Sequence, residues 1–303
     1  MRKLVRKRAV GAILALSLVA AACGSGDGAG DGEPIAVGSF AFNESVIVAE
    51  IYAQALEAEG FEVERKLNLG NREVVKPALE SGEIDLVPEY VGTLAGFLGA
   101  TPTSDSESTW NDAKAAFEET DVTLLDYSPA QDKNAYVVTA ETAAEYGLSQ
   151  VSDLQPVAGE LVFGGPPECP EREFCLLGLM EVYGLEFAEF TPLDAAGPIT
   201  IAALEGGEID VALLFTTQGI IADKGWVSLE DDQGLNPAEN LVPAIRTEVL
   251  DAYGDDLSDL LNRISAALTT EDLTELNKRA DIDQEDPAAL ATEWLTDNGF
   301  VDG

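Results

Sequence analysis

Aromatic and hydroxyl side chains follow two similar stretches of the chain, and their types are suited to binding a ligand. Residues 77–87 and 202–212 share the pattern Ala-Leu-Glu-x-Gly-Glu-Ile-Asp at an offset of 125 residues. Each copy is typical of a helix end, a left-handed glycine and a short buried strand. Tyr90 and Thr93 follow the first copy, and Phe215 follows the second. Because ligands of open α/β sheets bind outside the carboxyl ends of strands, the repeat indicates two lobes facing each other across a cleft.

The acidic residues of the two Gly-Glu-Ile-Asp motifs, at 82–85 and 207–210, are interpreted as structural. They fit a helix–strand joint better than an acid–base pair for catalysis. An aromatic residue near a strand end, taken alone, is ordinary packing, since aromatic side chains favour strands. Taken together, Tyr90, Tyr136 and Phe215 favour a binding site instead.

The composition excludes several classes of function. The chain has 303 residues and 46% hydrophobic content, which is enough to fill the cores of two domains. Its 56 acidic and 17 basic residues give a formal charge of −39, whereas nucleic-acid binding needs a basic surface. The chain contains no histidine, which removes Ser-His-Asp and Cys-His catalysis and imidazole metal sites. We therefore expect a binding protein without cofactor or metal, rather than an enzyme.

The N-terminus is typical of a targeting segment. Basic residues in the first eight positions precede a 13-residue apolar run, Val10–Ala22, which is short for a membrane span. The run ends at a sequence that resembles a bacterial lipoprotein signal with Cys23 as the lipid-bearing residue; an ordinary secretory signal is the alternative. Residues 1–22 are predicted to be a signal peptide, and residues 23–34 a flexible Gly/Asp tether. This places the protein on the extracytoplasmic face of the bacterial cell membrane, held by a lipid anchor.

Two further cysteines, Cys169 and Cys175, lie six residues apart. In an exported protein two nearby cysteines usually form a disulfide, which here would close a single loop. A metal site would need further soft ligands, and the chain has no histidine to supply them. A disulfide is therefore expected.

The remaining chain is divided between two α/β lobes with the same order of elements. The first lobe is assigned residues 35–127 and 246–303, and the second lobe residues 128–245. Each lobe is expected to begin with a strand, a helix and a second strand before its copy of the repeat. These elements are predicted at 35–38, 44–59 and 61–67 in the first lobe, and at 161–164, 176–183 and 187–190 in the second.

Four segments resemble the substrate-binding lipoproteins of osmoprotectant ABC importers, and the resemblance covers nearly all of the chain after the signal. These segments are Gly38-Ser39…Phe42-Asn43-Glu44, Glu50–Gln54, Gly82–Thr93 and Asp210–Thr217. The resemblance implies a two-lobed type II periplasmic-binding-protein fold with a ligand cleft between the lobes. It also implies binding of a quaternary amine such as glycine betaine, choline or carnitine, and delivery of this ligand to an ABC permease. A monomer is expected.

The resemblance further implies roles for individual side chains. A trimethylammonium group cannot donate strong hydrogen bonds, so family members surround it with aromatic rings, whose faces are negative. Tyr90 matches such a ring after the first-lobe strand, Tyr136 the ring after the passage between lobes, and Phe215 a position that is commonly tyrosine. Thr93 matches a residue that contacts the ligand's carboxylate, and Arg172 a carboxylate-binding arginine.

Two differences from the family pattern bear on the choice of ligand. The family often has Ser-Lys-Asn-Phe-Thr-Glu where this chain has Ser-Phe-Ala-Phe-Asn-Glu, so Phe40 replaces a lysine near the carboxylate and could add a ring. Asn43 lies in the same motif and is included among the candidate site residues. A further tyrosine of the family is replaced by residues 236–240. The loss of this lysine weakens the case for a small carboxylated ligand such as glycine betaine, and it strengthens the case for choline or a larger betaine such as ergothioneine.

Three other functions remain open from the sequence, of which an exported enzyme has the least support, because nothing in the chain supplies a nucleophile with its base. The chain could be an exported lipoprotein that senses a solute or binds another protein, or a binding protein for a different small polar solute. A permease and an ATPase encoded beside it would separate an importer from a sensor.

Overall fold

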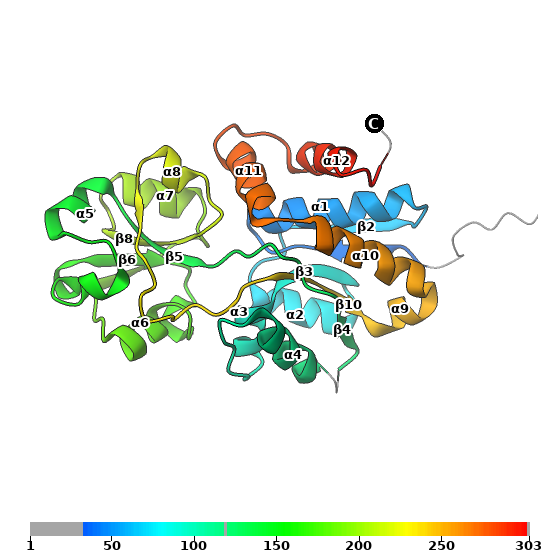
Figure 1. Ribbon diagram of the computed structural model, residues 1–303, viewed down its shortest axis with the longest axis horizontal. Helices are drawn as coiled ribbons and strands as arrows, with labels where there is room; N and C mark the ends of the chain where they lie inside the picture. The colour runs from blue at the N-terminus through cyan, green and yellow to red at the C-terminus, as the bar shows by residue number, and fades with distance from the viewer. Residues whose placement is uncertain (1–32, 118–119, 302–303) are drawn as a thin grey trace, which may run out of the picture.

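The computed structural model describes residues 33–117 and 120–301, which form two α/β lobes side by side (Figure 1). Each lobe contains one five-stranded sheet, so the predicted two-lobed α/β architecture is confirmed. No helix within these ranges is both long and apolar enough to span a membrane. The predicted signal peptide, Cys23 and almost all of the predicted tether lie outside the described residues.

The sheet of the first lobe has the strand order β2-β1-β3-β10-β4. Strand β1 runs parallel to β2 and β3, whereas β10 runs antiparallel to both β3 and β4. The strands are β1 (Ile35–Gly38), β2 (Val63–Lys66), β3 (Leu86–Tyr90), β4 (Val122–Leu124) and β10 (Leu241–Arg246). The helices are α1 (Asn43–Ala58), α2 (Arg72–Ser81), α3 (Val91–Phe97), α4 (Ser106–Phe117), α9 (Thr247–Tyr253), α10 (Asp255–Ala267), α11 (Thr270–Asp281) and α12 (Pro287–Asp297).

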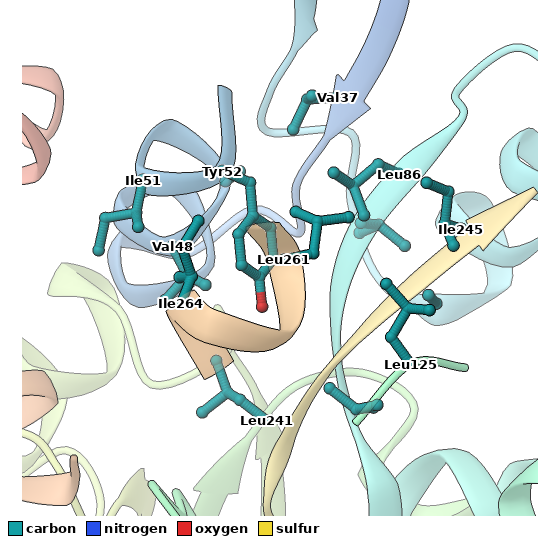
Figure 2. Close-up of a cluster of buried hydrophobic side chains, with 14 of the residues drawn as sticks. Val37, Val48, Ile51, Tyr52, Leu86, Leu125, Leu241, Ile245, Leu261 and Ile264 are labelled. Carbon is teal, nitrogen blue, oxygen red and sulfur yellow. The ribbon is translucent and has the colours of Figure 1, made fainter. Parts of the chain in front are cut away.

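Helix α1 is the centre of the core of the first lobe. Val48, Ile51 and Tyr52 of α1 lie beside Leu261 and Ile264 of α10, next to the strands of the sheet (Figure 2). Helices α11 and α12 pack on other sides of α1. Because neighbours surround it, nearly every turn of α1 is apolar rather than only one stripe.

The second lobe repeats the plan of the first. Its strand order is β7-β6-β8-β5-β9, with β6 parallel to β7 and β8, and β5 antiparallel to β8 and β9. The strands are β5 (Asn134–Val138), β6 (Val162–Gly165), β7 (Glu189–Pro192), β8 (Val211–Phe215) and β9 (Val227–Ser228). The helices are α5 (Ala140–Tyr146), α6 (Leu176–Tyr183), α7 (Pro198–Glu205) and α8 (Ile220–Asp223), with the short turns η1 (Val151–Leu154), η2 (Ala158–Glu160) and η3 (Cys169–Glu171).

The aspartates of the two Gly-Glu-Ile-Asp motifs make the same contact in both lobes. Asp85 Oδ2 accepts a hydrogen bond from the backbone N of Ala36, and Asp210 Oδ2 accepts one from Val162 N, each at 2.8 Å. Each carboxylate thereby holds two neighbouring parallel strands together, β1 and β3 in the first lobe and β6 and β8 in the second. These acidic residues are structural, in agreement with their interpretation from the sequence.

The isoleucine of each motif explains why the adjacent strand has a glycine at the position it faces. Ile84 packs over Gly38, and Ile209 packs over Gly164. An added Cβ on these glycines would lie 2.6 Å and 2.5 Å from the respective isoleucine Cδ1 atoms, too close for a carbon contact. A strand glycine at a site of such close approach is expected on steric grounds.

Two extended segments cross between the lobes and run side by side. The first leads from β4 to β5 and the second from β9 to β10, and Asp132 N donates to Glu239 O at 3.1 Å where they meet. The sequence assigned residues 128–245 to the second lobe, but residues 241–245 belong to β10 and pair with β3. The chain therefore re-enters the first lobe before residue 241, because β10 fills the place between β3 and β4.

Replacing Asp210 by alanine is expected to lower the free energy of unfolding by about 1–2 kcal/mol, because Val162 N loses a charged acceptor. Urea unfolding followed by circular dichroism measures this change. Glu208→Ala removes an exposed carboxylate of the same motif and should change stability by less than about 0.5 kcal/mol. If Asp210→Ala and Glu208→Ala lowered the free energy of unfolding equally, the structural role of Asp210 would be contradicted.

Candidate functional site

A cavity of ≈ 780 Å³ lies between the two lobes. Residues at or just after the carboxyl ends of all six parallel strands, β1–β3 and β6–β8, contribute to its lining. This is the edge at which ligands of open α/β sheets bind, and the volume is that of a small-molecule site. The cleft expected from the repeat is thus present.

Four aromatic rings form one wall of the cleft, which we call the aromatic wall. Phe42 is its centre, with ring centres 5.9 Å from Phe40, 6.0 Å from Tyr90 and 5.3 Å from Phe215. Phe40 and Phe42 come from the loop after β1 and Tyr90 from the end of β3, whereas Phe215 ends β8 of the second lobe. The wall therefore spans the boundary between the lobes.

The Tyr90 hydroxyl joins the aromatic wall to a buried carboxyl group. It donates to Glu44 Oε1 at 2.7 Å, while Thr217 Oγ1 and Asn277 Nδ2 each donate to Glu44 Oε2 at 2.6 Å. Burial raises the pKa of Glu44, although these hydrogen bonds oppose the shift. Burial and the charge of Glu44 also raise the pKa of Tyr90 well above its ordinary value, so its hydroxyl remains a donor.

A second buried carboxyl group, Asp132, comes from the first crossing segment and lines the cleft. Its Oδ1 accepts hydrogen bonds from Thr216 Oγ1 and from Thr217 N, both at 3.1 Å. Burial, and secondly the charge of Glu44, raise the pKa of Asp132 well above its ordinary value. The junction of the lobes therefore holds two neighbouring acidic groups.

Arg72 and Glu89 form a buried ion pair beside the aromatic wall. Arg72 Nη2 donates to Glu89 Oε2 at 2.8 Å and to Thr93 Oγ1 at 3.0 Å. The Arg72 guanidinium also lies 5.4 Å from the centre of the Phe40 ring. The Thr93 hydroxyl accepts the bond from Arg72 and keeps its own proton for donation into the cleft.

Glu239, on the second crossing segment, closes the cleft beside Thr93. Its Oε2 accepts from Gly92 N at 3.1 Å. An added Cβ on Gly92 would lie 2.5 Å from Ala238 O, so glycine is required for this close approach. Burial raises the pKa of Glu239 to about 8, with the charge of Arg72 opposing the shift. The protonated form of this carboxyl group is therefore favoured compared with that of an exposed glutamate.

Arg172 connects the two lips of the cleft. It lies in the loop closed by the disulfide between Cys169 and Cys175, which confirms the predicted pairing. Its guanidinium pairs with Glu73 of α2 and lies 4.9 Å from the centre of the Phe97 ring, both in the opposite lobe. Arg172 lines the cleft, but its charge is already paired, and its contact with a ligand carboxylate stays a prediction.

Five of the seven predicted binding residues line the cleft: Phe40, Tyr90, Thr93, Arg172 and Phe215. Tyr136 is 1% exposed and lies instead in the core of the second lobe, where its hydroxyl approaches Phe174 O at 3.3 Å. Asn134, two residues earlier on β5, lines the cleft in its place. A strand advances about 3.3 Å per residue, so Tyr136 lies about 7 Å deeper, behind the cleft surface.

Asn43 also lies outside the lining of the cleft. As the first residue of α1, it points toward α11, where its Nδ2 donates to Asp281 Oδ1 at 2.6 Å. Its neighbour Phe42 occupies the cleft surface instead. Asn43 therefore joins two helices of the first lobe.

Sequence reasoning missed five residues of the site: Phe42, Glu44, Arg72, Asp132 and Glu239. Phe42 and Glu44 belong to the segment that carries the family resemblance, and a closer reading of that segment would have found them. Asp132 and Glu239 lie on the crossing segments, whose approach to the cleft depends on how the lobes meet. Arg72 begins helix α2, and its sequence position gives no sign of a binding role. Its pairing with Glu89 of β3 is visible only in the folded structure.

A larger hollow of ≈ 1560 Å³ lies at the far end of the first lobe, around Ile35, Asp85 and Arg246. It opens at the amino ends of the parallel strands, opposite to the ends at which ligands of such sheets bind. Asp85 and Arg246 are paired with each other there. We therefore place the functional site in the cleft between the lobes.

The chain is similar to known proteins of one family. Residues 33–297 match the family model described as the substrate binding domain of ABC-type glycine betaine transport system. The chain is 30% identical over 297 residues to the carnitine transport binding protein OpuCC of Listeria monocytogenes, and 96% of each chain is covered. It is 27% identical to the glycine betaine-binding protein YehZ of Escherichia coli, with 88% of this chain and 92% of the relative covered. The crystal structure of a glycine betaine/carnitine/choline ABC transporter is similar with a TM-score of 0.70 at 26% identity, covering 88% of this chain and 99% of the other.

The pH dependence of stability is expected to change in the variant Glu239→Gln. Because the pKa of Glu239 is raised from 4.5 to about 8 in the folded state, the native protein keeps this proton longer than the unfolded chain. Its stabilising effect is present below pH 4.5 and is lost as the pH rises toward about 8. Melting temperatures measured across this range should fall less steeply in Glu239→Gln than in the parent. Glu171→Gln, at an exposed cleft residue, is the control, and a slope like the parent's in Glu239→Gln would refute the assignment.

Proposed function

The chain belongs to the family of substrate-binding domains of ABC-type glycine betaine transport systems, and on this premise we propose that its cleft captures a small quaternary amine outside the cell. Family members are extracytoplasmic substrate-binding proteins of ABC importers, not enzymes. The fold is that of a type II periplasmic binding protein. In this function the closed, loaded protein delivers the amine to the membrane permease.

The aromatic wall is the observation that carries the proposal. A trimethylammonium group is attracted to the faces of aromatic rings within about 6 Å of the ring centre. Phe40, Phe42 and Tyr90 present such rings from the first lobe, and Phe215 presents one from the second. A cation on this wall would contact both lobes at once, which is what a ligand needs in order to favour the closed arrangement.

The charge of the cleft also supports a cationic group. Its lining includes two guanidinium groups, Arg72 and Arg172, and six carboxyl groups, four of them besides Asp132 and Glu239, whose pKa values are raised. Both guanidinium groups are already ion-paired, with Glu89 and Glu73 respectively. A positive charge is therefore favoured over a negative one, and a betaine carboxylate would find a donor in the Thr93 hydroxyl beside Arg72.

The contacts between the lobes indicate how a ligand is enclosed. Thr217 of the second lobe donates to Glu44 of the first, and Arg172 pairs with Glu73 across the opening. Separating the lobes would break both contacts and expose the aromatic wall. The two crossing segments are the places at which such a hinge would bend.

We further propose that a lipid on Cys23 anchors the protein to the membrane and that it acts as a monomer. The basic and apolar residues before Cys23 support the anchor. The Gly/Asp-rich residues after it would give the folded lobes the reach to meet the permease.

Calorimetric titration with choline, glycine betaine and carnitine tests the proposed function. In Phe215→Leu, apolar contact is kept but one ring face is lost, so the affinity for the bound amine should fall about 3- to 30-fold, equivalent to about 0.5–2 kcal/mol. Tyr136→Phe is the matched control, because its ring lies behind the cleft surface and the affinity should stay unchanged. Failure of every quaternary amine to bind, together with tight binding of an uncharged or anionic solute, would overturn the proposal.

Cell fractionation tests the anchor. In cells that produce Cys23→Ala, the protein should move from the membrane fraction to the soluble extracytoplasmic fraction, because the variant lacks the thiol that carries the lipid. Cys169→Ala combined with Cys175→Ala removes only the loop disulfide and should leave the protein with the membrane. Membrane retention of Cys23→Ala would show that the anchor lies elsewhere.

A further inference from the structure

Two carboxyl groups, Glu44 and Asp132, are buried together at the junction of the lobes; we call them the acidic pair. They are 4% and 6% exposed. Within residues 33–117 and 120–301 no salt bridge reaches either of them. Thr217 bonds to both, its hydroxyl to Glu44 and its backbone N to Asp132. Two neighbouring like charges in a buried site cannot readily ionise together.

The hydrogen bonds of this cluster leave one buried acceptor, Asn277 Oδ1, without a donor among the described residues. Asp132 Oδ1 accepts two bonds, whereas its Oδ2 accepts none from the described residues and is not among their fully buried atoms without a partner. Asn277 donates to Glu44 through Nδ2, and its buried Oδ1 has no partner among those residues. A protonated carboxyl group is a donor as well as an acceptor. One proton on the acidic pair would therefore suit the cluster better than two negative charges.

The acidic pair adjoins the aromatic wall. Asp132 itself lines the cleft, Glu44 accepts the Tyr90 hydroxyl, and Phe215 directly precedes Thr216, which donates to Asp132. A quaternary ammonium group on the wall would bring a permanent positive charge beside the pair. Such a charge favours the ionised form of a neighbouring carboxyl group.

The other groups around the acidic pair come from several elements. From β3 come Tyr90 and Glu89, of which Glu89 is paired with Arg72, and the second crossing segment supplies Glu239. Lys133 directly follows Asp132 in the chain, and helix α11 carries Lys278 and Asp281. Among the described residues, no hydrogen bond or salt bridge joins these three side chains to the acidic pair. Proton release from Glu239 could be mistaken for release from the acidic pair, because Glu239 also lines the cleft and has a raised pKa.

We propose that the acidic pair holds one proton in the ligand-free cleft and releases it when a quaternary ammonium group binds on the aromatic wall. The inference rests on the proposed function, and it adds that ligand capture and proton release are coupled. The proton leaves the pair for solvent and the second carboxylate stays ionised beside the bound cation. By linkage, affinity then rises with pH while the free pair is protonated, by up to about tenfold per pH unit.

Titration calorimetry with choline, in buffers of different ionisation enthalpy, measures the protons released on binding. The parent protein should release up to about one proton per choline, giving an observed enthalpy that depends on the buffer. Asp132→Asn and Glu44→Gln should each abolish this release, and each should flatten the dependence of affinity on pH. The use of two variants keeps the test valid if one of them fails to fold.

Two control variants separate the acidic pair from other carboxyl groups of the cleft. Glu239→Gln should keep the proton release, although it removes the other cleft carboxyl group with a raised pKa. Glu171→Gln, at an exposed lip residue, should also keep it. If the release disappears in Glu239→Gln and persists in Asp132→Asn, the assignment to the acidic pair is wrong.

The possible failures are distinguishable. Tight choline binding with the same enthalpy in every buffer would refute the coupling and leave the proposed function standing. If the folded parent binds neither choline nor any betaine, the proposed function fails, and this inference fails with it.

Discussion

The burial of Glu44 is the constraint on which the arrangement of the molecule depends. A carboxyl group removed from water needs hydrogen-bond donors, and without them its burial costs several kcal/mol. Its donors Tyr90, Thr217 and Asn277 lie 46, 173 and 233 positions away in the chain. They come from the first sheet, the second lobe and the C-terminal helices. Satisfying this one group therefore requires that all three parts meet at the cleft.

The two lobes share their internal construction and differ at the ends of their strands. In both sheets an aspartate joins two neighbouring parallel strands, β1 with β3 and β6 with β8. In both, an isoleucine also packs over a glycine of the adjacent strand. Beyond β3 the first lobe places Tyr90 and Thr93, and beyond β8 the second places Phe215 and its threonines. A common scaffold thus brings unlike side chains to opposite sides of one cavity, which gives the cleft its aromatic and acidic surfaces.

Much of the fold and part of the site follow from the sequence, because local patterns determine them. The repeat located the strand ends, and with them Tyr90, Thr93 and Phe215, since a residue that ends a parallel strand reaches the edge of the sheet. Tyr136 does not line the cleft, and the sequence could not show this because its depth depends on how far β5 extends toward the cleft. The pairing of Arg172 with Glu73 joins residues of different lobes, and no local pattern contains it.

The position of β10 has a consequence for the order in which the protein folds. The second lobe is a continuous insertion, whereas the sheet of the first lobe has a vacancy between β3 and β4 until Leu241–Arg246 arrives. Helices α10–α12, which cover α1, come later still. A chain that emerges from its N-terminus therefore completes the second lobe before the first lobe. Until then, an unpaired edge of β3 is exposed, and such edges are where misassembly and capture by chaperones begin.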